Sequence, residues 1–90
     1  MYKAESGLAS VVQASRTVRG RVVDETGEPI IGANIVEKGT TNGVITDING
    51  DFSIEVKTGA ILQVSYIGYE TIEVSSNQNL SKILLREVTR

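Results

Sequence analysis

From Thr17 onward, apolar and polar residues alternate over short segments, a pattern typical of strands with one buried face. It is clearest in residues 51–56, where Phe52, Ile54 and Val56 share one face and polar residues share the other. Further strands are predicted at 17–24, 33–38, 43–47, 61–67, 69–74 and 81–87. No segment keeps a helical period over three turns, so the chain is predicted to be all-β.

Gly, Asn and Asp gather in the breaks between these segments, as they do in turns. Seven short strands at this spacing predict a β-sandwich, and the lack of a crossover helix argues against a parallel sheet. Two glycines fall inside predicted strands. Gly20 is expected to mark a bulge or a close backbone approach, and Gly68 a kink where the chain bends between two sheets.

The alternation also predicts which side chains face the core. The inward positions are Val18, Val22, Ala33, Ile35, Val44, Phe52, Ile54, Val56, Leu62, Val64, Ile72, Val74, Ile83 and Leu85.

The stretch "TDINGDF", residues 46–52, resembles the start of a calcium loop because Asp47, Asn49 and Asp51 are spaced two apart. An EF-hand loop also needs glycine at position 6 and glutamate at position 12. Counted from Asp47, these positions hold Phe52 and Thr58. The stretch is therefore predicted to be a tight hairpin turn between 43–47 and 51–56, with Asp47 accepting backbone N–H bonds, and no metal site is expected.

Composition narrows the chemistry further. The 90 residues include no Cys and no His, which excludes Ser–His and Cys–His nucleophiles and the usual zinc sites. The carboxylates Asp24, Asp47 and Asp51 are expected to be solvated turn caps, so no catalytic residue and no cofactor are predicted. The net charge is −2 without a basic face, so no nucleic-acid partner is expected, and no apolar run is long enough for direct membrane insertion.

Two roles are open for Tyr66 and Tyr69. One is an exposed binding platform. The other, which a small sandwich favours, is that of core or corner tyrosines whose phenols hydrogen-bond to the backbone.

Residues 1–16 show no sustained period and are predicted to be a flexible lead-in. Their origin is open between a signal-peptide remnant, a linker and a segment added for expression. The β-sandwich domain itself is expected over residues 17–88.

The turn and core residues together form a family pattern. It runs through "VRGRVVDETGEPIIGANIVEKGTTNGVITDINGDFSIEV" and "LQVSYIGYE", about residues 18–87. This pattern closely resembles the carboxypeptidase-regulatory-like domain at the N-terminus of SusC/RagA-type TonB-linked outer-membrane proteins. The resemblance implies a transthyretin-like Greek-key sandwich of seven strands, in agreement with the strand count.

The resemblance also implies a context: the periplasmic face of the outer membrane, in a TonB-dependent transporter of glycan or peptide nutrients. The implied role is a non-catalytic accessory or interaction domain. Its partner would be the plug and barrel of its own transporter or a periplasmic protein, and the isolated domain is expected to be monomeric. The alternative is a sandwich module of another multidomain protein, such as a peptidase or surface adhesin, where it aids folding or binds glycan.

Overall fold

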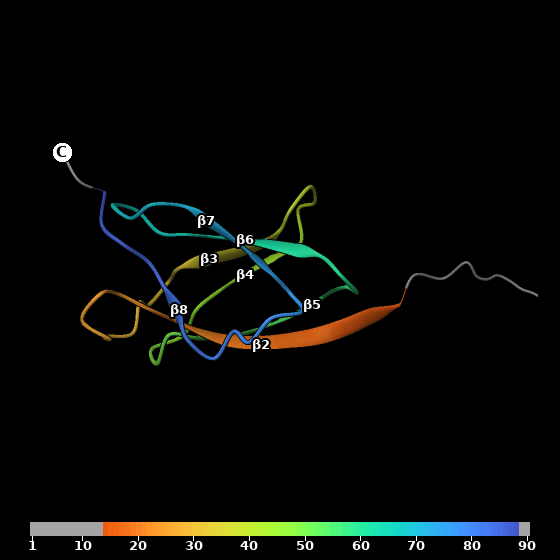
Figure 1. The fold of residues 1–90 in the computed structure, drawn as a ribbon, viewed down its shortest axis with the longest axis horizontal. Helices are drawn as coiled ribbons and strands as arrows, with labels where there is room; N and C mark the ends of the chain where they lie inside the picture. The colour runs from red at the N-terminus through yellow and green to blue at the C-terminus, as the bar shows by residue number, and fades with distance from the viewer. Residues whose placement is uncertain (1–13, 89–90) are drawn as a thin grey trace, which may run out of the picture.

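The computed structural model describes residues 14–88, so residues 1–13 of the expected lead-in lie outside the described part (Figure 1). Its strands are β2 (Ser15–Val23), β3 (Asn34–Glu37), β4 (Gly43–Ile45), β5 (Asp51–Lys57), β6 (Ile61–Ser65), β7 (Ile72–Ser75) and β8 (Ile83–Leu84). No helix in residues 14–88 is long and apolar enough to cross a bilayer.

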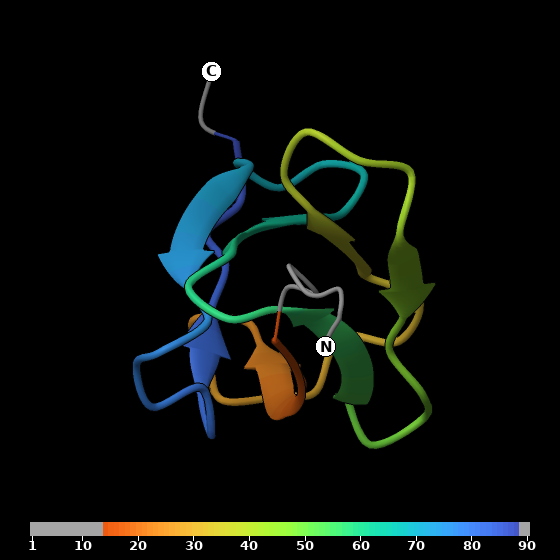
Figure 2. The same ribbon diagram turned by 90° about the vertical axis from the view of Figure 1, so that its right-hand side faces the viewer.

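The strands form two sheets that face each other across the core (Figure 2). One has three strands in the order β5-β2-β8, and the other has four in the order β4-β3-β6-β7. The chain changes sheet four times: after β2, β4, β5 and β7. The all-β, seven-stranded sandwich predicted from the alternating pattern is thus confirmed.

The sheets are antiparallel, as the argument against a parallel sheet predicts, apart from one short parallel pairing. β8 runs parallel to β2, with Val22 opposite Ile83 and Val23 opposite Leu84. Between them the chain passes through the other sheet, and this long excursion replaces the crossover helix that parallel pairing usually needs. The pairing is only two residues long, and all other neighbouring strands are antiparallel.

The core largely follows the predicted inward positions, although Val44, Ile72 and Val74 are only partly buried. Among residues 14–88, three buried apolar residues lie outside that set: Val23, Ile30 and Leu80. Ile30 and Leu80 lie in connections between strands, where there is no alternating pattern that would predict their burial.

β2 is the central strand of its sheet and pairs with β5 over seven residues, from Ser15 opposite Lys57 to Arg21 opposite Asp51. It starts two residues before the predicted range. Gly20 lies where the backbone must be approached closely, as expected: a Cβ there would be 2.5 Å from the Leu80 carbonyl oxygen and 2.7 Å from the Phe52 ring. Gly68 does not bend the chain between sheets, because β6 and β7 on either side of it belong to one sheet.

Candidate functional site

The stretch 46–52 is a turn held by the Asp47 carboxylate. Its Oδ1 accepts hydrogen bonds from the backbone N–H groups of Asn49 (2.9 Å) and Asp51 (3.0 Å). Gly50, with φ of 77°, closes the turn through its N–H to the Asp47 carbonyl oxygen at 2.9 Å. Asp47 therefore has the backbone-capping role predicted for it.

The predicted hairpin is wrong, however. β4 and β5 belong to different sheets, so the turn carries the chain from one layer of the sandwich to the other. The local turn residues fix how sharply the chain reverses. They do not decide which neighbours the two strands pair with, because pairing depends on contacts far along the chain.

A second turn of the same design lies at residues 24–28. The Oδ1 atom of Asp24 accepts from the N–H groups of Thr26 (2.8 Å) and Glu28 (3.0 Å), and from the Thr26 hydroxyl (2.7 Å). These hydrogen bonds, the Thr26 hydroxyl first, lower the pKa of Asp24. The carboxylate is thus a turn cap, as predicted.

Two further carboxyl groups, those of Asp51 and Glu73, have lowered pKa values, which favours their ionised forms. Hydrogen bonds from Arg21 lower the pKa of Asp51, and those from Lys38 and Gln63 lower the pKa of Glu73. A general acid working near neutral pH needs the opposite shift. No group of three or more potential metal-ligating side chains occurs among residues 14–88.

Glu37 is the carboxylate that the sequence reasoning missed. It is only 5% exposed and lies between the two sheets. Its Oε1 accepts from the Asn42 side-chain amide at 3.0 Å, and its Oε2 accepts from the Lys57 backbone N–H at 3.2 Å. The Asn42 hydrogen bond is the main reason that the pKa of Glu37 is lowered. The missed signal is parity: Glu37 falls on the same face of its strand as Ala33 and Ile35.

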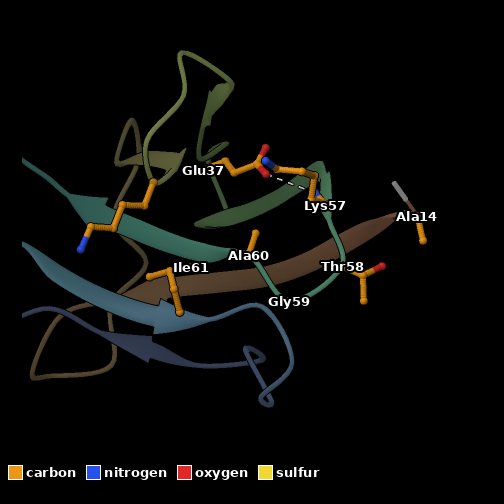
Figure 3. Close-up of a pocket in the computed structure, with 8 residues that line it drawn as sticks. Ala14, Glu37, Lys57, Thr58, Gly59, Ala60 and Ile61 are labelled. Atoms are coloured by element: carbon orange, nitrogen blue, oxygen red, sulfur yellow. Dashed lines mark hydrogen bonds between the residues drawn. The ribbon is translucent and has the colours of Figure 1, made fainter. Parts of the chain in front are cut away.

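An open groove of about 580 Å³ lies beside Glu37, at the end of the sandwich where β2 begins (Figure 3). The turn between β5 and β6 forms its floor, where the Thr58 N–H donates to the Ala14 carbonyl oxygen at 3.0 Å. Figure 3 shows the Glu37 carboxylate directed at the Lys57 backbone. Since both carboxylate oxygens already accept hydrogen bonds, Glu37 here joins the two sheets and is not poised as a base.

The two tyrosines lie at the opposite end of the sandwich. Their ring centroids are 5.9 Å apart with planes tilted by 50°, and both pack against the edge of the core. They line a groove of about 220 Å³ together with Asp24, Pro29 and Ile31. No phenol–backbone hydrogen bond is found within residues 14–88. The tyrosines are therefore half-buried packing residues that also present a surface.

Comparison with known proteins shows the family of this chain. Residues 18–89 match the CarboxypepD_reg-like domain family. The chain is 52% identical over 68 residues to the TonB-dependent receptor SusC of Bacteroides thetaiotaomicron, which covers 76% of the chain but 7% of that receptor. It is 45% identical over 64 residues to the TonB-dependent receptor P39 of Formosa agariphila, covering 70% of the chain and 6% of the receptor.

Among solved structures, a type II cohesin–X-dockerin complex from Acetivibrio cellulolyticus contains a chain with a similar fold. The TM-score is 0.63 at 28% identity, and the similarity covers 77% of this chain and 56% of that one. The sandwich architecture is thus shared with a protein of another kind, while the sequence identity is highest with the receptors. The match over most of its length shows that this chain belongs to the CarboxypepD_reg-like domain family, in the form found in the N-terminal region of SusC-type TonB-dependent receptors.

Proposed function

We propose that this chain is a non-catalytic accessory domain of a TonB-dependent outer-membrane receptor that imports glycan or peptide nutrients, and that it lies on the periplasmic face. The observation that carries the proposal is its 52% identity over 68 residues with the receptor SusC. Because the chain spans only 7% of that receptor, the transport activity belongs to the parts outside this domain.

A role in protein contact, rather than in chemistry, is supported by where the polar groups are used. The carboxylates of Asp24, Asp47 and Glu37 accept hydrogen bonds from N–H groups of the domain's own turns and strands. Both end grooves are shallow and open, which suits contact with another surface more than the enclosure of a small substrate.

We expect the isolated domain to be monomeric because the outer edge of β5 is blocked by side chains. Asp47 accepts from the Asp51 N–H at 3.0 Å, Asn42 donates to the Glu55 carbonyl oxygen at 2.7 Å, and Glu37 accepts from the Lys57 N–H. These groups would otherwise be free to pair with a strand of a second copy.

The alternative is a module of another multidomain protein, such as a peptidase or surface adhesin, that aids folding or binds glycan. The observation in its favour is the similar fold in the cohesin–X-dockerin complex. The flanking reading frame separates the two: a TonB box and plug after Arg90 support the receptor, and a catalytic zinc domain supports the alternative.

The direct test is to delete residues 15–88 from the complete receptor and to measure growth on each nutrient that the receptor serves. We expect slower nutrient-dependent growth with an unchanged amount of barrel in the outer membrane. Growth on a sugar that does not need the receptor is the control. Normal growth of the deletion strain on every nutrient would contradict the accessory role.

A further inference from the structure

The tyrosine end of the sandwich carries exposed apolar side chains that the fold does not need. Ile67 is 87% exposed at the tip of the loop between β6 and β7, and Ile31 is 55% exposed beside the tyrosine groove. Val88, on the last described stretch of chain, is 45% exposed. We call Ile31, Tyr66, Ile67, Tyr69 and Val88 the tyrosine-end patch. A gathered apolar surface of this kind is typical of a contact site.

The chain leaves the domain at this patch. The Glu70 N–H donates to the Arg86 carbonyl oxygen at 2.8 Å, and the Val88 N–H donates to the Gly68 carbonyl oxygen at 2.9 Å. Tyr69 and Glu87 form an antiparallel bridge between these two bonds. Residues 86–88 are therefore held against the loop that presents Ile67, and Figure 1 shows the C-terminal stretch leaving from this end.

Most of a SusC-type receptor follows its CarboxypepD_reg-like region. In such a receptor the following part of the polypeptide is attached to the domain at this end, beside the patch. Such tethering raises the local concentration to roughly millimolar, which makes even a weak contact effective. A surface beside the exit point is the one that this attachment holds nearest to the following part.

The charge around the patch defines what fits it. Burial of the Tyr69 ring, and then the nearby carboxylates of Glu87, Asp24 and Glu25, raise the pKa of its phenol. Among residues 14–88, Arg86 is a cation close to these carboxylates, and it is paired with Glu25 at 3.0 Å. The rim is therefore acidic, and it favours an apolar surface flanked by Lys or Arg.

From these observations we infer that the tyrosine-end patch docks onto the part of the same receptor polypeptide that follows residue 90, through an apolar surface with a basic rim. The inference rests on the proposed function, since it takes the chain to be part of a receptor. It assigns the contact to this end of the sandwich and not to the groove beside Glu37.

Cysteine labelling in the complete receptor tests this assignment. The domain contains no Cys, so Ile67→Cys introduces its only thiol, in a receptor whose other cysteines are replaced. Ile48→Cys is the matched control, because Ile48 is also a loop isoleucine, is 75% exposed, and does not line the tyrosine groove. We expect position 67 to react with a water-soluble maleimide about tenfold more slowly than position 48, because docking withdraws it from solvent.

Adding Ile31→Asp to the Ile67→Cys receptor places a charge in the contact and should restore fast labelling. Ile45→Asp, on an exposed isoleucine outside the patch, should not. Fast labelling at position 67 in the purified receptor overturns the inference. So does protection that exists only in cells, which points to a separate periplasmic protein, or protection that falls on dilution, which points to a second copy of the chain.

These outcomes are distinct from those of the deletion of residues 15–88. If deletion slows growth but position 67 is labelled freely, the accessory role is supported and the docking surface is contradicted. If position 67 is protected but deletion leaves growth normal, the docking surface is supported and the accessory role is contradicted.

Discussion

Two five-residue turns, 24–28 and 47–51, are built on the same hydrogen bonds but lie in different surroundings. In each, the first residue is an aspartate whose Oδ1 accepts from the N–H groups two and four residues later, at 2.8 and 3.0 Å for Asp24 and at 2.9 and 3.0 Å for Asp47. In each, the fourth residue is a glycine with positive φ, Gly27 at 89° and Gly50 at 77°.

The difference lies in what surrounds the glycine. A Cβ on Gly27 would meet no atom within 4 Å, whereas a Cβ on Gly50 would be 2.6 Å from the Val22 carbonyl oxygen and 3.0 Å from Pro29 Cβ. The Gly50 carbonyl oxygen also accepts from the Val22 N–H at 2.8 Å. The same turn hydrogen bonds thus occur in a surface turn with open space at its glycine at one site and in a packed joint at the other.

The sharpest test of this difference is a pair of glycine substitutions. Gly50→Ala should destabilise the domain by about 2–4 kcal/mol, because it combines an unfavourable left-handed backbone with overpacking against Val22. Gly27→Ala should cost only about 1 kcal/mol, from the backbone alone. Denaturant unfolding of the two variants and the parent chain measures both values.

Because the backbone penalty is shared, the gap between the two variants isolates the cost of the packed joint. Equal decreases in the free energy of unfolding for the two variants would contradict this difference between the turns. A larger decrease for Gly27→Ala than for Gly50→Ala would contradict it as well.

A second contrast lies in two threonines near these turns. Thr46 is buried: its Oγ1 donates to the Ile30 carbonyl oxygen at 2.6 Å and accepts from the Ala33 N–H at 2.8 Å. Thr46→Val keeps the shape but leaves both backbone groups without a partner, at a cost of about 2–3 kcal/mol. Thr26 is exposed, so Thr26→Val should cost less than about 1 kcal/mol. Chemical denaturation of both variants gives the comparison, and equal losses would contradict it.

The two turns also show how far the sequence predicts this fold. "DETGE" and "DINGD" both announce a turn with its aspartate cap, because those hydrogen bonds lie within five residues. The hairpin predicted across the second turn is wrong, because β4 pairs with β3 and β5 pairs with β2. The parallel pairing of β8 with β2 escaped prediction for the same reason: the two strands are about sixty residues apart in sequence.

Alternation predicts the core residues correctly where strands are regular, as in β5, but not where the chain is irregular. Ile30 and Leu80 are buried from connections, and only the assembled sandwich shows that these loops fold inward. Glu37 is the reverse case: alternation placed it inward, but its charge hid it from the list of core residues. Its burial depends on partners from Asn42 and Lys57 that no local pattern supplies.

We expect acid to destabilise the first turn, residues 24–28, by protonating Asp24. Its hydrogen bonds lower its pKa in the folded state below the usual 3.8, so folding favours the ionised form. Its contribution to stability is therefore complete well above the unfolded pKa and is lost as the pH falls through the lowered folded value. We expect the parent chain to lose more melting temperature than Asp24→Asn between about pH 6 and about pH 3.

Asp24→Asn retains a side-chain oxygen that can accept the same bonds, which keeps the turn while removing the titration. Differential scanning calorimetry across this range measures the effect. Parallel pH dependences for the two proteins would show that the cap does not depend on the charge of Asp24.

The smallest expected effect is that of calcium on stability, which tests whether the turn at residues 47–51 is a calcium site. The Oδ1 atom of Asp47 already accepts two backbone N–H bonds, and Asp51 is paired with Arg21 at 2.8 Å. The glycine and the distal glutamate of a calcium loop are also missing from the expected positions. We therefore expect millimolar calcium to leave the melting temperature of the parent chain unchanged to within about 1 °C, since a ligand that does not bind the native state adds no stability. Magnesium at the same concentration controls for ionic strength. A calcium-specific rise in melting temperature that Asp47→Ala abolishes, while Asp24→Ala retains it, would show that the second turn differs from the first in its chemistry as well as its packing.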